Sequence, residues 1–110
     1  MERDLEEYVS SAPGRPILVH FYAHWSTVGV LGWTILNSSE IGKAFDEVGA
    51  LRIAADLTEN DETRWKSLRR LGGQTVPTTA IYDPEDQTWE LMPEVFTVEE
   101  AVRWADPFRH

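Results

Sequence analysis

The sequence predicts an α/β fold in which a mixed, four-stranded sheet carries helices on both faces. Two observations lead to this fold class. Strand-like segments at residues 17–22 and 51–57 are separated by helical sequence, which is the connection that parallel strands require. Segments 78–82 and 88–92 are separated only by a short turn, which is typical of an antiparallel hairpin. A sheet with both kinds of pairing follows.

The chain begins with a predicted helix and lead-in over residues 1–13, of which residues 2–11 form a short acidic helix. Two prolines and a glycine within residues 12–16 end this helix. Residues 17–22 (ILVHFY) are apolar nearly throughout, as a strand covered on both faces should be. We therefore expect this strand in the interior of the sheet.

Two helices are predicted between the first two strands. One begins near Ser26 and fades at residues 37–39, where a capping serine starts a shorter helix that runs through Phe45. The strand at 51–57 follows, and a right-handed crossover should place it parallel to the first strand.

The next predicted helix covers residues 61–71. Trp65, Leu68 and Leu71 recur at the spacing of a core-facing stripe, and Gly72 stands at the helix exit.

The last third of the chain contains the hairpin and a final helix. Residues 83–87 form the predicted turn between its strands. Thr97 and Glu100 have the spacing of a capping box at the start of the last helix. Four tryptophans are expected to pack in the core, namely Trp33, Trp65, Trp89 and Trp104.

Composition excludes several classes of function. The formal net charge is −9, which disfavours binding to nucleic acid or to anionic membranes. No apolar run approaches the length of a membrane span. The chain contains no cysteine, so thiol chemistry, disulfides and thiolate metal sites are all excluded. A length of 110 residues predicts one domain over residues 1–110.

Three segments carry a resemblance to a known family: residues 16–25 (PILVHFYAHW), 51–61 (LRIAADLTEND) and 68–83 (LRRLGGQTVPTTAIYD). In order and spacing they resemble the thioredoxin-like superfamily, most of all the C-terminal domain of the thiol:disulfide interchange protein DsbD. The resemblance covers residues 14–106 and implies the thioredoxin fold. It implies a periplasmic location if this chain is a domain of a longer DsbD-like protein, whereas the acidic N-terminus favours the cytoplasm if the chain is complete.

The redox motif of that family is missing here. Its members carry Trp-Cys-x-x-Cys, and the attacking and resolving cysteines correspond to Ser26 and Gly29 in this chain. A serine hydroxyl is far too weak an acid to replace a thiolate, and glycine has no side chain. His20 and His24 stand where the family often has acidic residues that handle protons. The chain is therefore expected to be redox-inactive and not a thiol–disulfide oxidoreductase.

Ser26 and the histidines each have two interpretations. Ser26 is either a nucleophile activated by His20 or His24, or the N-cap of a helix, and the absence of a motif such as G-x-S-x-G favours the cap. Two imidazoles are too few to bind a metal, so no metal site is expected. We expect His20 to be buried and hydrogen-bonded, and we consider His24 a candidate for tuning binding with pH.

The resemblance also implies a cis proline at Pro77, beside which the backbone receives an extended peptide. We expect a protein- or peptide-binding, chaperone-like module that needs no cofactor. Its predicted binding surface consists of Trp25, Ser26, Thr27, Val28, Gly29, Val76 and Pro77. Of these, Trp25, Thr27 and Val28 are expected to form an exposed apolar patch with Val76 and Pro77. The alternatives are a glutathione- or serine-dependent enzyme and a structural domain of a larger DsbD-like protein.

Overall fold

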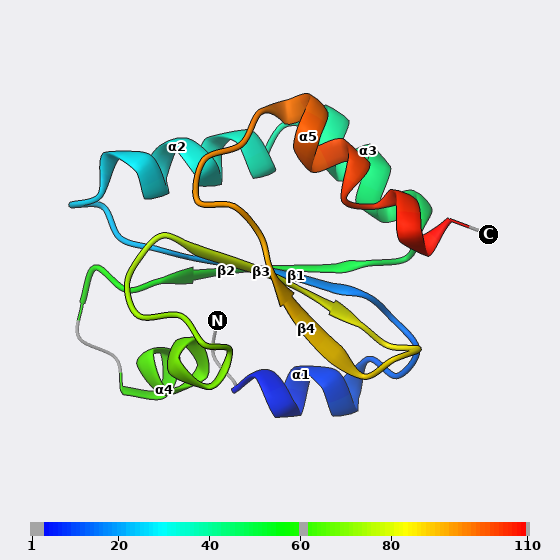
Figure 1. Ribbon diagram of the computed structural model, residues 1–110, viewed down its shortest axis with the longest axis horizontal. Coiled ribbons are helices and arrows are strands. Elements are labelled where there is room, and N and C mark those ends of the chain that lie inside the picture. The colour runs from blue at the N-terminus through cyan, green and yellow to red at the C-terminus, as the bar shows by residue number, and fades with distance from the viewer. Residues whose placement is uncertain (1–3, 60–61, 110) are drawn as a thin grey trace.

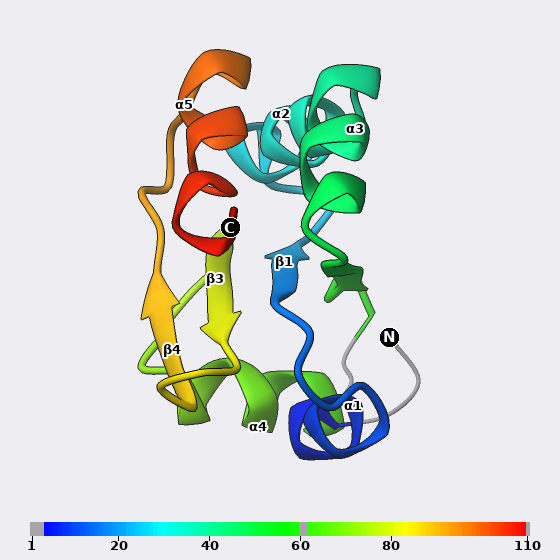
Figure 2. The same cartoon turned by 90° about the vertical axis from the view of Figure 1, so that its right-hand side faces the viewer.

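The computed structural model describes residues 4–59 and 62–109, which form the predicted α/β fold with a mixed, four-stranded sheet. Helices α2, α3 and α5 lie on one face of the sheet, and α1 and α4 lie on the other (Figure 1). Figure 2 shows the sheet between these two helical layers. The elements are α1 Leu5–Ser11, β1 Ile17–Tyr22, α2 Thr27–Leu36, α3 Ser39–Glu47, β2 Leu51–Asp56, α4 Glu62–Arg70, β3 Thr78–Asp83, β4 Thr88–Leu91, α5 Val98–Arg103 and a 3₁₀ turn, Asp106–Phe108.

Strand β1 lies inside the sheet, whose order is β2-β1-β3-β4. It pairs in parallel with β2 and antiparallel with β3, so that Ile17 faces Leu51 on one side and Tyr82 on the other. All six residues of β1 are buried. The prediction of an interior strand at residues 17–22 is therefore confirmed.

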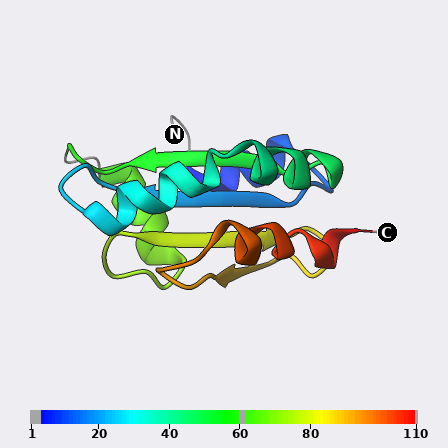
Figure 3. The ribbon, with the colours of Figure 1, turned by 90° about the horizontal axis from the view of Figure 1, so that it is seen from above.

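Alternate residues of β1 supply two separate hydrophobic cores. Ile17, Val19 and Phe21 point toward the layer of α1 and α4, where Leu68 joins them. Leu18 points to the other side and packs with Phe45 and neighbouring apolar residues of α2, α3 and α5. Seen from above, α2 and α3 lie over β1 and β2, while α5 lies over β3 (Figure 3). His20 shares the face of Leu18, so it lies beneath α2.

Where the sequence predicts a capping residue within the described parts of the chain, the capping hydrogen bond forms with one exception. The Thr97–Glu100 capping box forms as expected. Ser38 occupies the N-cap position of α3, but its side chain makes no capping hydrogen bond, and its Oγ is buried without a partner. Helix α1 begins at Leu5 because Asp4 is its N-cap, with the Asp4 side chain accepting a hydrogen bond from the Glu7 N–H.

Boundaries shift slightly from their predicted positions. Strand β2 ends at Asp56 and β4 at Leu91, each one residue early, whereas β3 continues to Asp83. The predicted helical residues 2, 3 and 61 lie outside the described residues. The four tryptophans expected in the core are only partly buried. Trp65 and Trp89 pack at the margin of one core and Trp104 at the margin of the other, whereas Trp33 packs on the ring of Tyr22.

The two edges of the sheet are β2 and β4. At the end of β2, the Arg64 guanidinium of α4 donates a hydrogen bond of 2.5 Å to the carbonyl oxygen of Asp56.

No helix within residues 4–59 and 62–109 combines the length and the hydropathy that crossing a membrane would require.

Candidate functional site

Ser26 starts helix α2 at the carboxyl end of β1. Its Oγ accepts a hydrogen bond of 3.2 Å from the Gly29 N–H, and its carbonyl oxygen accepts one of 3.0 Å from the Val30 N–H. The hydroxyl therefore satisfies a helical N–H that would otherwise lack a partner. The structure confirms the prediction that Ser26 is a cap.

Gly29 brings α2 close to the strand and to the Pro77 loop. A Cβ at this position would lie 3.3 Å from the Cβ of Tyr22 and 3.6 Å from the Cβ of Pro77. The peptide bond between Val76 and Pro77 is cis. The two predicted halves of the site, residues 26–29 and 76–77, are therefore neighbours in space.

Three large apolar side chains are exposed around the first turns of α2. Trp25 is 64% exposed, Val28 is 42% exposed and Leu31 is 55% exposed. We call these three residues the α2 surface. The sequence prediction included Trp25 and Val28 but omitted Leu31, although its position three residues after Val28 is the spacing of one helix face.

The predicted contribution of the Pro77 loop to this apolar patch is wrong. Val76 is only 6% exposed and Pro77 is also buried. Val76 belongs to the core beneath the sheet, where it packs in a cluster with Leu68 and Ala80. Any contact that this loop makes with a partner must therefore involve its main chain or the exposed Thr75.

His20 is buried and hydrogen-bonded at both ring nitrogens, as predicted. Its Nε2 lies 3.0 Å from the carbonyl oxygen of Gly29, and its Nδ1 lies 2.6 Å from the Thr79 Oγ1. A carbonyl oxygen only accepts, so Nε2 carries the proton. In the neutral ring, Nδ1 then accepts from the Thr79 hydroxyl. Burial lowers the pKa of His20, and the hydrogen bond to Gly29 opposes that shift only in part.

Gly32 gives the His20 ring its space. A Cβ on Gly32 would lie 3.1 Å from the Cε1 of His20. The ring also stacks on Tyr22, with centroids 5.7 Å apart. The glycines that weaken α2 as a helix therefore let it approach β1 closely enough to receive the hydrogen bond of His20.

His24 links the β1–α2 turn to the end of β2. Its ring Nε2 lies 3.2 Å from the Oδ2 of Asp56, and its backbone N–H donates a hydrogen bond of 2.8 Å to the Thr58 Oγ1. Burial alone would raise the pKa of Asp56, but hydrogen bonds from Thr58 and the nearby His24 outweigh it and lower that pKa. His24 is exposed, so it is accessible to a partner, as a residue that tunes binding with pH must be.

The arrangement offers little support for serine catalysis. Both nitrogens of His20 bond to groups other than Ser26, and the Ser26 hydroxyl accepts a hydrogen bond from the Gly29 N–H. Within the described parts of the chain, no three His, Asp or Glu side chains come close enough to hold a metal ion.

Similarity to known proteins is visible in structure only. No protein-family model matches the sequence, and no curated protein matches it. The C-terminal domain of Neisseria meningitidis DsbD superposes in its oxidised form with a TM-score of 0.71 and 21% identity, covering 94% of this chain and 89% of that one. Its reduced form gives a TM-score of 0.72 and 20% identity, with coverages of 94% and 90%.

A thioredoxin from Thermus thermophilus is similar over 96% of this chain and 82% of its own, with a TM-score of 0.65 and 16% identity. Such likenesses agree with the element order and the strand order described above. This chain has the thioredoxin fold and resembles the C-terminal domain of DsbD in structure, but it contains no cysteine.

Proposed function

We propose that this chain is a redox-inactive thioredoxin-fold module that binds another protein, or an extended peptide, through the α2 surface. The observation that carries the proposal is the exposure of Trp25, Val28 and Leu31 on adjoining turns. Helix α2 contains no charged residue, so no charged side chain of the helix would lose its hydration when an apolar partner binds. Exposed apolar patches of this kind typically mark interaction surfaces.

Redox inactivity is supported by the chemistry of the residues at the former cysteine positions. Ser26 caps a helix and Gly29 is packed against Tyr22 and Pro77, so neither residue transfers electrons. In an insulin-reduction assay we expect no turnover above a protein-free blank. Turnover that persists through repurification would contradict this part of the proposal.

A protein partner is also supported by a structural relative. Thioredoxin f2, which has 12% identity to this chain and a TM-score of 0.64, is known in a complex with ferredoxin:thioredoxin reductase. The partner of this chain would place apolar side chains against Trp25, Val28 and Leu31. Its extended backbone would run beside the main chain of the Val76–Pro77 loop. Main-chain pairing of that kind adds affinity without sequence preference.

The test is site-specific photocrosslinking. A photoreactive residue at Val28 should capture a partner in extracts of the source organism, and Leu31→Ser should reduce that capture at least about tenfold because apolar contacts are lost. The matched control is Leu91→Ser, which alters another exposed leucine, 45% exposed on β4. Equal capture by both variants, or the same products from a photoreactive residue at position 91, would overturn the proposal.

His24 supplies a candidate for pH tuning of that binding, since it precedes Trp25 and pairs with Asp56. If His24 tunes binding, the amount of partner captured by the natural chain should differ between pH 8 and pH 6. The amount captured by His24→Gln should be the same at both pH values. A pH dependence that persists in the variant would assign the effect elsewhere.

A further inference from the structure

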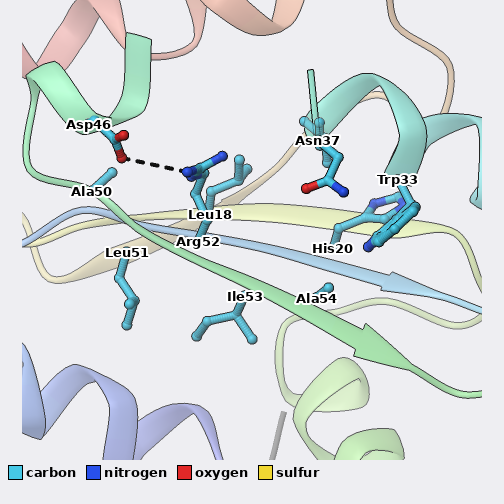
Figure 4. A pocket seen from close by; sticks show the side chains of 11 residues that line it. Leu18, His20, Trp33, Asn37, Asp46, Ala50, Leu51, Arg52, Ile53 and Ala54 are labelled. Atoms are coloured by element: carbon cyan, nitrogen blue, oxygen red, sulfur yellow. Dashed lines mark ion pairs between the residues drawn. The ribbon is translucent and has the colours of Figure 1, made fainter. Parts of the chain in front are cut away.

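A cavity of about 390 Å³ lies between the end of α2, the end of α3 and strand β2. Its volume falls within the usual range of small-molecule sites. Figure 4 shows Leu51 and Ile53 pointing away to the other side of β2, while the remaining labelled side chains surround the space above the strand. The α2 surface occupies the opposite end of the same helix, so the two features are separate.

Arg52 reaches the cavity from β2. It pairs in register with Leu18, and both side chains point toward the helical layer of α2 and α3 (Figure 4). A Cβ on Gly42 of α3 would lie 3.3 Å from the Nη1 of Arg52. The missing side chain at Gly42 therefore leaves room for the guanidinium to lie against α3.

Opposite charges stand side by side in this cavity without a hydrogen bond between them. The Nη2 of Arg52 lies 3.6 Å from the Oδ1 of Asp46, which is beyond hydrogen-bonding distance. Both side chains are accessible, at 36% and 71% exposure. Each group thus keeps its capacity to bond with a ligand, as does the nearby Asn37 amide (Figure 4).

Apolar groups form the rest of the wall. Trp33 and Leu36 come from α2, and Leu18 lies on the floor. A purely anionic ligand would be repelled by Asp46, and a purely cationic ligand would be repelled by Arg52. A ligand that carries a negative and a positive charge close together, next to an apolar group, can interact with Arg52, with Asp46 and with the apolar wall.

We propose that this cavity binds a free α-amino acid with an apolar side chain. The ligand carboxylate accepts hydrogen bonds from the Arg52 guanidinium, which favours planar carboxylates. The ligand ammonium group donates to the Asp46 carboxylate. Its side chain packs against Trp33 and Leu36.

The test is a titration of the ¹⁵N-labelled chain with leucine, followed by backbone amide shifts. Leucine should shift the amides of Asn37 and Arg52 in a saturable manner. N-acetyl-leucine lacks the ammonium group and leucinamide lacks the carboxylate, so each should bind at least about tenfold more weakly through the loss of a charged hydrogen bond. No saturable shift with leucine, or equal binding of all three compounds, would overturn the proposal.

Two variants and a matched control complete the experiment. Arg52→Gln and Asp46→Asn should each weaken leucine binding at least about tenfold. Arg69→Gln removes an arginine from another ion pair of the same length, 3.6 Å to Glu62, and should leave binding unchanged. The spectrum of each variant reports whether it is folded. Unchanged binding in either folded cavity variant, or an equal loss in the control, would overturn the assignment.

Discussion

His20 is the residue on which three elements converge, because it belongs to β1 and bonds to Gly29 of α2 and Thr79 of β3. Its imidazole is held neutral, since burial lowers its pKa. This side chain therefore serves as a fixed hydrogen-bonding link between the three elements. The same side chain should therefore make folding stability depend on pH.

We expect the free energy of unfolding to decrease as pH falls below about 6.5, the ordinary pKa of histidine. The lowered pKa means that unfolded His20 binds a proton at a pH where folded His20 does not, so acid favours the unfolded chain. The stability that neutral His20 contributes is fully present above the pKa of histidine in the unfolded chain, and it is lost as the pH falls below that value. Asp56 also has a lowered pKa, but its contribution is lost only near pH 4 and below. Urea unfolding between pH 7.5 and pH 5 therefore measures the contribution of histidine to the free energy of unfolding without that of Asp56.

Two variants check this assignment. His20→Gln should have a lower stability at pH 7.5 but a flatter dependence on pH across that range. Thr79→Val should be less stable throughout, by about 1–3 kcal/mol, because it leaves Nδ1 without its donor. It should nevertheless retain the pH dependence. A natural chain whose stability does not change between pH 7.5 and pH 5 would contradict the prediction.

At the scale of elements, the two serine N-caps of the α2–α3 layer differ in a testable way. Ser26 makes a capping hydrogen bond, whereas Ser38 makes none and buries its hydroxyl without a partner. Ser26→Ala should lower the free energy of unfolding by about 1 kcal/mol, the typical value of an N-cap. Ser38→Ala should leave stability unchanged or raise it, because it removes a buried oxygen that lacks a hydrogen bond.

Urea denaturation of both alanine variants measures this difference directly. Ser26→Asp serves as a control, since aspartate also caps helices and should restore the stability lost in Ser26→Ala. Equal losses for Ser26→Ala and Ser38→Ala would show that the capping geometry does not determine their stability.

The positions of helices and strands could be predicted from the sequence better than which side of a helix is exposed. The apolar run of β1, the hairpin turn and the Thr97–Glu100 box are local signals, and all three lie where the sequence analysis placed them. Helix α2 is different, because it has no charged residue to mark its solvent side. The only sequence signal for the exposure of Leu31 is therefore its spacing from Val28.

Tertiary packing also determines that Val76 and Pro77 of the Pro77 loop are buried. Val76 looks like an exposed loop residue in the sequence, but the chain after α4 turns it into the core with Leu68. The charged cavity was equally inaccessible to sequence reasoning, since Asp46 and Arg52 meet only after α3 folds back along β2. Long-range contacts of this kind leave no periodic pattern in the chain.

For the whole molecule, the net charge of −9 should make stability sensitive to salt. Raising NaCl from about 10 to 150 mM shortens the Debye length from about 30 to 8 Å, which screens repulsion among acidic groups. The described ion pairs are exposed and individually weak, so their screening should cost less. We expect the melting temperature to rise by about 2–5 °C, a stabilisation of less than 1 kcal/mol.

Calorimetry in NaCl and KCl at equal ionic strength checks this, because screening predicts the same increase in both salts. A melting temperature that falls with salt would mean that the surface ion pairs dominate the electrostatics of folding.

The contact between Arg64 and the end of β2 bears on how copies of this protein behave when crowded together. An unpaired edge strand is a template for another strand, and repeated pairing of that kind leads to aggregation. The Arg64 guanidinium bonds to the Asp56 carbonyl oxygen, an acceptor that an incoming strand would otherwise use. Arg52 adds a second charged side chain along the same strand, and β4, at the other edge, is only four residues long. The fold thus protects both open edges of its sheet while leaving the α2 surface accessible.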